Sequence, residues 1–275
     1  MSFLPPKWPV ETPITRARSS LWDRCIVALP FWQTRPRNVV AGAFTTIIGS
    51  PALVATPRGY GLDFNGNDQG LSVPAAFTSQ AITISFMFRR TAMNTDARVL
   101  IEHTENFNTT NFTFSIFLLS DNKIKVNIHD TGGRYSQKSF NLPPVGEMVF
   151  CTATFELSDV SGGRHQVGLW INGSNPSGTF IQNNTIPTDQ PFGGGASFPI
   201  HIAARAGNAF ETQTQFSSVM VHDRLLSDAE IKLLHADPFQ MFAPDMGAIA
   251  ALAGDAAAST TTLNRTATVT GTSSV

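Results

Sequence analysis

Short segments in which apolar and polar side chains alternate constrain this chain most strongly. In residues 82–88 Ile or Phe occupies every second position, and Thr83 and Ser85 stand between them. Successive side chains of a β-strand point to opposite faces, so this pattern predicts a strand with one buried face. The alternation recurs in three later segments, at residues 112–118, 124–128 and 148–156. Several such strands can bury their apolar faces only by packing two sheets together.

A tight turn and two late strands extend the pattern. Asn172-Gly173 follows an apolar run and is the strongest short hairpin signal, because both central residues of that turn need positive φ angles. Residues 199–204 and 216–221 supply the last strands. We therefore predict an all-β fold, a two-layer antiparallel β-sandwich.

One short helix is predicted near the C-terminal end of the domain, at Asp228–Ala236. Ser227 and Glu230 have the spacing of a capping box, in which each side chain bonds the other residue's backbone amide. Apolar residues flank that box as a hydrophobic staple, and Pro238 ends the helix. Four apolar side chains in and around the helix are expected to be buried: Leu226, Ile231, Leu234 and Phe239.

Three stretches carry motifs of a known family. Residues 216–242 contain a strand, then Arg-x-Leu-Ser-x-x-Glu-Ile-x-x-Leu, then Asp-Pro-Phe-x-x-Phe. Residues 59–66 read Gly-x-x-Leu-x-Phe-x-Gly, and residues 166–173 are a strand that ends in Asn-Gly. Together they resemble the laminin G-like, concanavalin A-like jelly-roll domains of tailed-phage and prophage structural proteins. The resemblance covers residues 20–244 and implies the jelly-roll form of the sandwich.

Composition changes at both ends of the chain. Residues 1–20 are rich in Pro, and residues 245–275 are rich in Ala, Ser and Thr. Such stretches cannot bury enough apolar area to fold alone. We predict a jelly-roll domain at 21–244 between two extended arms that attach to an assembly. Five apolar side chains are the predicted anchors of these arms: Phe3, Leu4, Trp8, Leu263 and Val269.

Charge and cysteine content exclude several classes of protein. A net charge of -1 with 14% charged residues argues against nucleic acid as a partner, because phosphate binding needs clustered cations. Cys25 and Cys151 are predicted to be buried free thiols. We expect no signal peptide and no membrane insertion, because the chain lacks the apolar runs that both require. Synthesis in a host cytoplasm is therefore expected.

No catalytic residue is predicted. Jelly-roll glycoside hydrolases need a pair of carboxylates on one strand, as nucleophile and general acid. Glu102, Glu147, Glu156 and Glu211 are each isolated in the sequence. The chain is therefore expected not to be an enzyme, and a glycoside hydrolase is the weakest of the alternatives.

No cofactor is predicted, although the resemblance implies that Ca²⁺ at the rim of a sheet should be considered. The candidate ligands are Asp63, Asn65, Asn67 and Asp68, the one oxygen-rich cluster in the matching region. A tight turn explains the same residues, because Asn, Asp and Gly are the usual turn residues.

Two aromatic side chains fall on the outward phase of their predicted strands, Phe117 and Trp170. Exposed aromatic residues on such a sheet serve either carbohydrate binding or a protein interface. Both alternatives stay open at this point.

Two functions follow from these observations. The first is a non-enzymatic virion structural protein of a tailed phage, in a head decoration, head fibre or tail-associated position. Its partners would be other virion proteins and further copies of itself, and its place would be the virion. The alternative is a carbohydrate-binding module that contacts glycans of the host surface.

Overall fold

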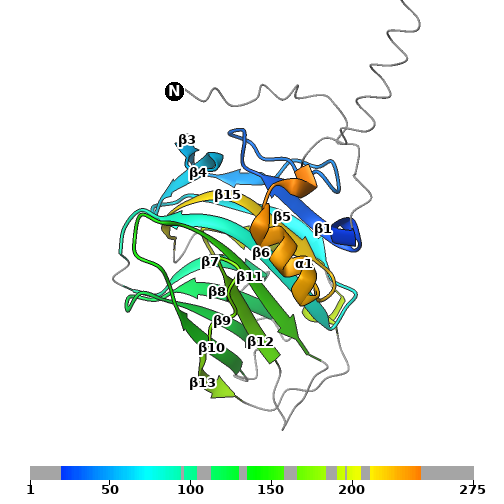
Figure 1. Cartoon of the computed structure of the whole chain (residues 1–275). Helices are drawn as coiled ribbons and strands as arrows, with labels where there is room; N and C mark the ends of the chain where they lie inside the picture. Colours follow the sequence, from blue (N-terminus) through cyan, green and yellow to red (C-terminus); the bar gives the residue numbers. More distant parts are fainter. Residues whose placement is uncertain are drawn as a thin grey trace, which may run out of the picture. The chain divides into compact units, whose positions relative to one another are not determined.

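The computed structural model describes residues 20–93, 96–103, 113–129, 135–157, 166–183, 191–195, 197–205 and 211–242. Two compact units can be separated. Asp23–Pro238 forms the larger one and holds both β-sheets and the α-helix α1, Asp228–Ala236 (Figure 1). Of the other unit, Met1–Trp22 with Phe239–Val275, the structure describes the short 3₁₀ turns η1 (Ser20–Trp22) and η3 (Gln240–Phe242).

Sheet A has seven strands, all paired antiparallel. In spatial order they are β12 (Gln166–Ile171), β11 (Met148–Glu156), β6 (Ala81–Arg90), β15 (Gln213–His222), β4 (Gly59–Asn65) and β3 (Ala52–Thr56), with β1 (Cys25–Pro30) also paired to β15.

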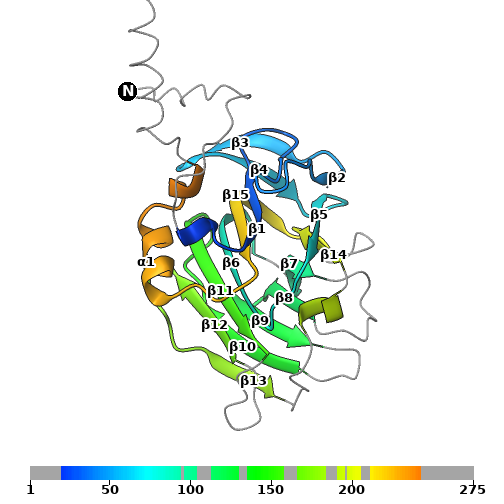
Figure 2. The ribbon, with the colours of Figure 1, turned by 90° about the vertical axis from the view of Figure 1, so that its right-hand side faces the viewer.

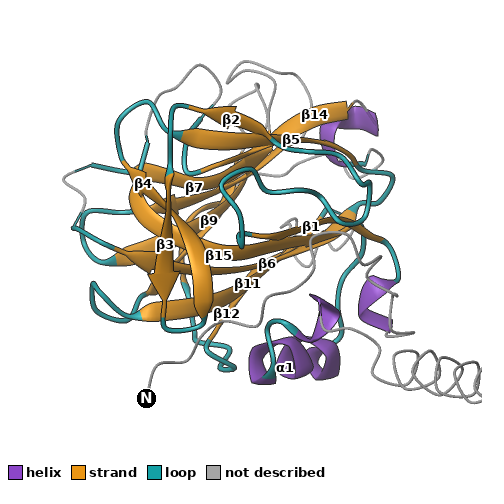
Figure 3. Cartoon of the chain, turned by 90° about the horizontal axis from the view of Figure 1, so that it is seen from above, coloured by secondary structure: helices purple, strands orange, loops and turns teal. Residues whose placement is uncertain are grey.

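Sheet B has eight strands, also antiparallel. In spatial order they are β13 (Thr179–Asn183), β10 (Tyr135–Asn141), β9 (Lys123–His129), β8 (Thr113–Leu118), β7 (Arg98–His103), β14 (Ser197–Ile202), β5 (Gly70–Ala76) and β2 (Thr46–Ile48). The 3₁₀ turn η2 (Phe192–Gly195) precedes β14. Figures 2 and 3 show the two sheets stacked, with α1 on the side of sheet A that faces away from sheet B. The predicted two-layer antiparallel sandwich is confirmed.

The core lies between the sheets and follows the alternation of the sequence. In β6 the side chains of Ile82, Phe86 and Phe88 are fully buried, and Phe114 and Ile116 of β8 belong to the same cluster. Burying a side chain of this size contributes about 1.5–3 kcal/mol. The apolar faces of the two sheets therefore supply most of the stability of the sandwich.

The helix α1 begins and ends as predicted. Glu230 N donates to Ser227 Oγ over 3.3 Å, and Ser227 N donates to Glu230 Oε2 over 2.9 Å, which completes the capping box. Arg224 Nη2 lies 2.8 Å from Glu230 Oε1. Its hydrogen bond is the main reason why the pKa of Glu230 is lowered to about 2. Beside the start of the helix, a charged pair therefore supports the cap.

Three of the four apolar side chains expected to be buried are buried, Leu226, Ile231 and Leu234. The prediction for Phe239 is wrong, because this side chain is only partly buried. The chain makes a 3₁₀ turn there, in which Phe242 N donates to Phe239 O over 2.9 Å. Burial falls instead on Met241 and Phe242, at the end of the turn.

Both cysteines are free and buried, as predicted. Burial raises the pKa of the Cys151 thiol, so the thiol stays protonated and unreactive. Within the part of the chain that the structure describes, no helix is long and apolar enough to cross a membrane. The predicted anchors Phe3, Leu4, Trp8, Leu263 and Val269 lie outside the described residues.

Candidate functional site

Polar side chains form a continuous row across the outer face of sheet B. The strand register joins them in the order Thr46, Ser72, His201, Glu102, Ser115, Asn127 and Gln137. Neighbours along the strands, such as Ile116 beside Ser115 and Val126 beside Asn127, belong to the core. Because side chains alternate along a strand, the row points away from the core. We call these seven residues the polar row.

The middle of the polar row is buried but not fully hydrogen-bonded. Glu102 is 0% exposed and Asn127 is 4% exposed. Asn127 Nδ2 donates to Ser115 Oγ over 3.1 Å. Neither Asn127 Oδ1 nor Glu102 Oε1 accepts a hydrogen bond from any described residue. Buried acceptors are normally satisfied, and one left without a donor costs about 1–3 kcal/mol. These two oxygens therefore have no hydrogen-bond donor within the described part of the chain.

Arg205 supplies the counter-charge of Glu102. Its Nε lies 3.0 Å from Glu102 Oε2, and its side chain is 11% exposed. Burial raises the pKa of Glu102, and the charge and hydrogen bond of Arg205 act against that rise. One carboxylate oxygen is thus held by the ion pair, and Oε1 is left to other partners.

An aromatic ring with two cationic side chains against it lies beside the polar row. Phe117 of β8 pairs with Lys125 of β9, whose Nζ is 4.7 Å from the centre of the Phe117 ring. The guanidinium carbon of Arg205 is 5.5 Å from the same ring. Burial lowers the pKa of Lys125, and the charge of Arg205 lowers it further. Lys125 forms no ion pair with a carboxylate among the described residues. Two like charges therefore share one aromatic ring.

Carboxylates are scarce on sheet B. Its eight strands contain one, Glu102. The same strands contain four Lys and Arg residues: Arg98, Lys123, Lys125 and Lys138. Glycoside hydrolysis by a pair of carboxylates would need a second one close to Glu102, and these strands do not provide it. The register places Arg98 and Lys138 opposite the core residues Leu118 and Val126, so of these four only Lys123 and Lys125 lie on the outer face.

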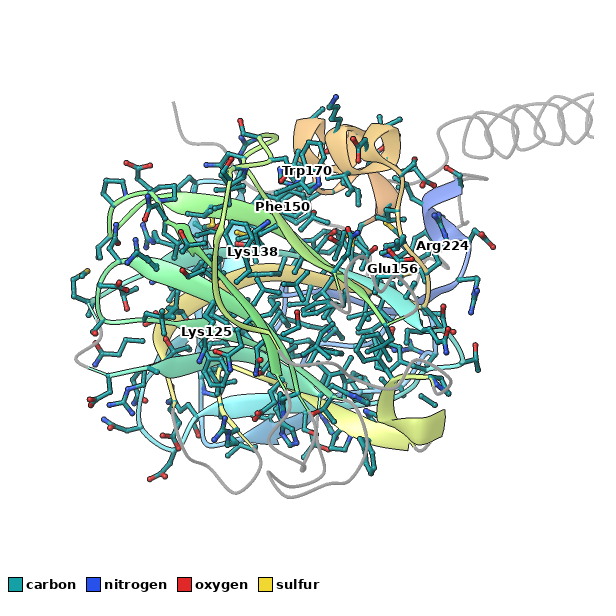
Figure 4. The ribbon with its side chains drawn as sticks, turned by 90° about the horizontal axis from the view of Figure 1, so that it is seen from below. Lys125, Lys138, Phe150, Glu156, Trp170 and Arg224 are labelled. Atoms are coloured by element: carbon teal, nitrogen blue, oxygen red, sulfur yellow. The ribbon has the colours of Figure 1, made fainter. Side chains whose placement is uncertain are left out.

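The two aromatic candidates lie on different sheets. Trp170 belongs to β12 of sheet A and is 7% exposed, with Lys232 Nζ of α1 5.9 Å from the ring centre. Phe117 is 8% exposed. Figure 4 shows Trp170 and Phe150 beside α1, and Lys125 on a separate part of the domain. Both rings were expected to be exposed, but neither is, and a cationic side chain lies against each of them. Their role in a carbohydrate or protein interface stays a prediction.

The oxygen-rich cluster proposed for calcium forms a tight turn. Asn65 Oδ1 accepts from Asn67 N over 2.8 Å, and Gly66 and Asp68 have φ angles of 79° and 49°. Asp63 precedes the turn within β4, and its Oδ1 accepts no hydrogen bond from a described residue. Among the residues with described structure, no three His, Cys, Asp or Glu side chains are grouped to hold a metal. A calcium site stays a prediction.

A hollow of about 250 Å³ lies on the outer side of sheet A. It is lined by Arg58, Met87, Met148, Phe150, Asn172, His235 and Pro238. The polar atoms of its histidine are engaged within the fold. His235 Nδ1 accepts from Gly173 N over 2.6 Å, and Nε2 lies 3.1 Å from Thr152 Oγ1. Burial lowers the pKa of His235 to about 4, so the neutral ring fastens α1 to the sheet.

Comparisons with known proteins agree with this geometry. A family model described as the concanavalin A-like lectin/glucanases superfamily matches residues 65–232. The match covers more than half of the chain, and the chain belongs to this superfamily. A search of curated protein sequences found no match.

Solved structures with the same fold include receptor-binding domains of botulinum neurotoxins. The serotype G binding domain is 13% identical with a TM-score of 0.60, over 78% of this chain and 51% of that one. The binding domain of neurotoxin DC in complex with rat synaptotagmin II is 15% identical with a TM-score of 0.58, over 79% and 52%. The serotype D domain in complex with N-acetylneuraminic acid is 12% identical with a TM-score of 0.56, over 80% and 52%. This chain spans about half the length of those chains, and at such identity the likeness shows the fold alone.

Proposed function

We propose that this chain is a non-enzymatic adhesive protein of a tailed-phage virion, and that the outer face of sheet B binds a glycan. The observation that carries this proposal is the polar row, with two buried oxygens that no described residue satisfies. Sugar hydroxyls are donors of the right kind for such acceptors. A buried acceptor that gains its hydrogen bond only in the complex increases the affinity for ligands that supply the donor.

The absence of turnover is part of the proposal. Glu102 is the one carboxylate on the strands of sheet B, and one of its oxygens is held by Arg205. Retaining and inverting glycosidases both need two carboxylates that flank the bond to be cut. A face with one carboxylate and several amides and hydroxyls is suited to binding without hydrolysis. The structural neighbours are receptor-binding and binding domains of botulinum neurotoxins, which supports a binding role for this fold.

The virion part of the proposal rests on the closing motif of residues 216–242 and on the composition of the two arms. We propose that residues 1–20 and 245–275 attach the domain to other virion proteins or to further copies of the chain. Removal of either arm should leave the sandwich folded, because its core comes from strands between them.

A glycan array and calorimetry test the proposal with the full chain. Asn127→Ala should weaken binding of a captured saccharide by about tenfold or more, which corresponds to one lost hydrogen bond of about 1.4 kcal/mol. Asn141→Ala is the matched control, because Asn141 is exposed on the adjacent strand β10. Unchanged thermal unfolding of both variants would separate binding from stability. Two results would contradict the proposal: no saccharide on the array binds, or the protein cleaves one and Glu102→Gln abolishes cleavage.

A further inference from the structure

The site on sheet B has a charge that a neutral sugar would not satisfy. We propose that its ligand is an acidic saccharide, and that the anionic group lies between Lys125 and Arg205 beside the Phe117 ring. This inference rests on the proposed glycan-binding function and adds the class of glycan.

The arrangement of cations carries the inference. Lys125 Nζ and the Arg205 guanidinium lie 4.7 Å and 5.5 Å from the centre of one aromatic ring. Glu102 is the only carboxylate on these strands, and its ion pair is with Arg205. Lys125 is half-buried and forms no ion pair with a described carboxylate. An anion beside Lys125 would offset a charge that no described carboxylate balances, and a partly buried site screens that attraction less than an exposed one.

The groups next to the cations indicate a saccharide as the carrier of the anion. Glu102 Oε1 and Asn127 Oδ1 are buried acceptors that need donors, and Ser115 lies between these residues in the register. A sugar with a carboxylate or a sulfate offers both the anion and several hydroxyl donors on one ring. A nucleic acid would offer the anion but would require a far larger cluster of cations than this chain has.

The test compares an acidic ligand with its neutral counterpart and with a second acidic ligand. Calorimetry with the full chain would use an oligogalacturonate, its carboxyl-reduced neutral counterpart and a sulfated oligosaccharide. We expect an acidic ligand to bind about tenfold or more tightly than the neutral one, with the difference reduced as salt is added. Comparison of the carboxylate and the sulfate then identifies which anion the site prefers.

Substitutions of two lysines on β9 test where the anionic group of the ligand binds. Lys125→Met should bring the affinity for the acidic ligand close to that for the neutral one, and Lys125→Arg should retain most of the difference. Lys123→Met is the matched control, because Lys123 lies on the same strand and pairs with Asp121 in the adjoining turn. Thermal unfolding of each variant checks that the fold is intact.

Three outcomes overturn the inference in distinguishable ways. If neutral and acidic saccharides bind alike and Lys125→Met changes neither, the acidic class is wrong and the glycan-binding function stands. If no saccharide binds, both fail. If a glutamate-rich peptide binds more tightly than every saccharide and depends on Lys125, the site takes an acidic protein segment, and both statements about glycans fail.

Discussion

The outer faces of the two sheets carry similar small polar side chains but use them differently. Under helix α1, Thr83 Oγ1 donates to Arg224 O and accepts from Leu226 N, each over 2.9 Å. Thr152 Oγ1 lies 2.9 Å from Ser85 Oγ and 3.1 Å from His235 Nε2. Under α1 the chain itself therefore provides the partners, and the hydrogen bonds fasten the helix to sheet A.

On sheet B the central acceptors lack such partners. Glu102 Oε1 and Asn127 Oδ1 accept from no described residue, although both residues are as deeply buried as those under α1. Residue type alone does not distinguish a structural polar face from a binding face. What distinguishes them is whether another segment of the same chain returns to satisfy the polar atoms.

The largest effect is expected at the ion pair of sheet B. Arg205→Met would leave the Glu102 carboxylate buried and unpaired, which typically costs about 3–5 kcal/mol. The double variant Arg205→Met with Glu102→Gln removes the charge as well and should recover a large part of that loss. Denaturant titration of both proteins measures the difference. A single variant as stable as the wild type would show that Glu102 is solvated or paired elsewhere.

A somewhat smaller effect is expected where α1 covers sheet A. Leu234→Ala should lower the free energy of unfolding by about 3 kcal/mol, because Leu234 is fully buried and its loss leaves a cavity. Leu233→Ala is the matched control, since Leu233 is 49% exposed and should change stability by less than about 0.5 kcal/mol. Equal losses at the two positions would mean that the helix packs through a different face.

The smallest effect is expected from pH. The pKa of His235 is about 4 in the folded chain and about 6.5 when exposed, so the unfolded chain binds more protons between these values. Its contribution to stability is complete above pH 6.5 and is lost as pH falls toward 4. We expect a loss of about 1–2 kcal/mol, less than the full shift implies because the ring is partly exposed.

Comparing the pH dependence of a His235 variant with that of the wild type separates the contribution of His235 from those of other histidines. His103 is fully buried and its pKa is lowered to about 3, so it also contributes to acid sensitivity. His235→Gln should therefore show a flatter dependence of unfolding free energy on pH than the wild type, with the remaining slope due to other groups. Identical pH profiles would contradict the role of His235 as a neutral fastener of α1.

The local features of the fold were predictable from sequence. The strand β12, the helix α1 with its capping box and the Asn172-Gly173 turn, with φ angles of 48° and 83°, are where the patterns place them. Each depends on residues within a few positions of one another. Periodicity, capping and turn chemistry act over that range, and so they can be recognised without coordinates.

Four strands of sheet B were not predicted, β2, β7, β10 and β13, and all but β13 carry part of the site. In β7 a register shift between Val99 and Ile101 interrupts the alternation. In β10 most side chains are polar, so no apolar face stands out. Because β7 holds Glu102 and β10 holds Gln137, the polar row could not be recognised from sequence.

The fold class, the helix and its cap could be read from the sequence, because side-chain alternation and capping are properties of neighbouring residues. Which polar residues meet depends on the folded arrangement of the strands. Glu102, Ser115 and Asn127 come from three strands that backbone pairing brings into one row, and Arg205 reaches Glu102 from beyond the end of β14. Pairing between distant segments sets such contacts, and it leaves no periodic trace along the chain.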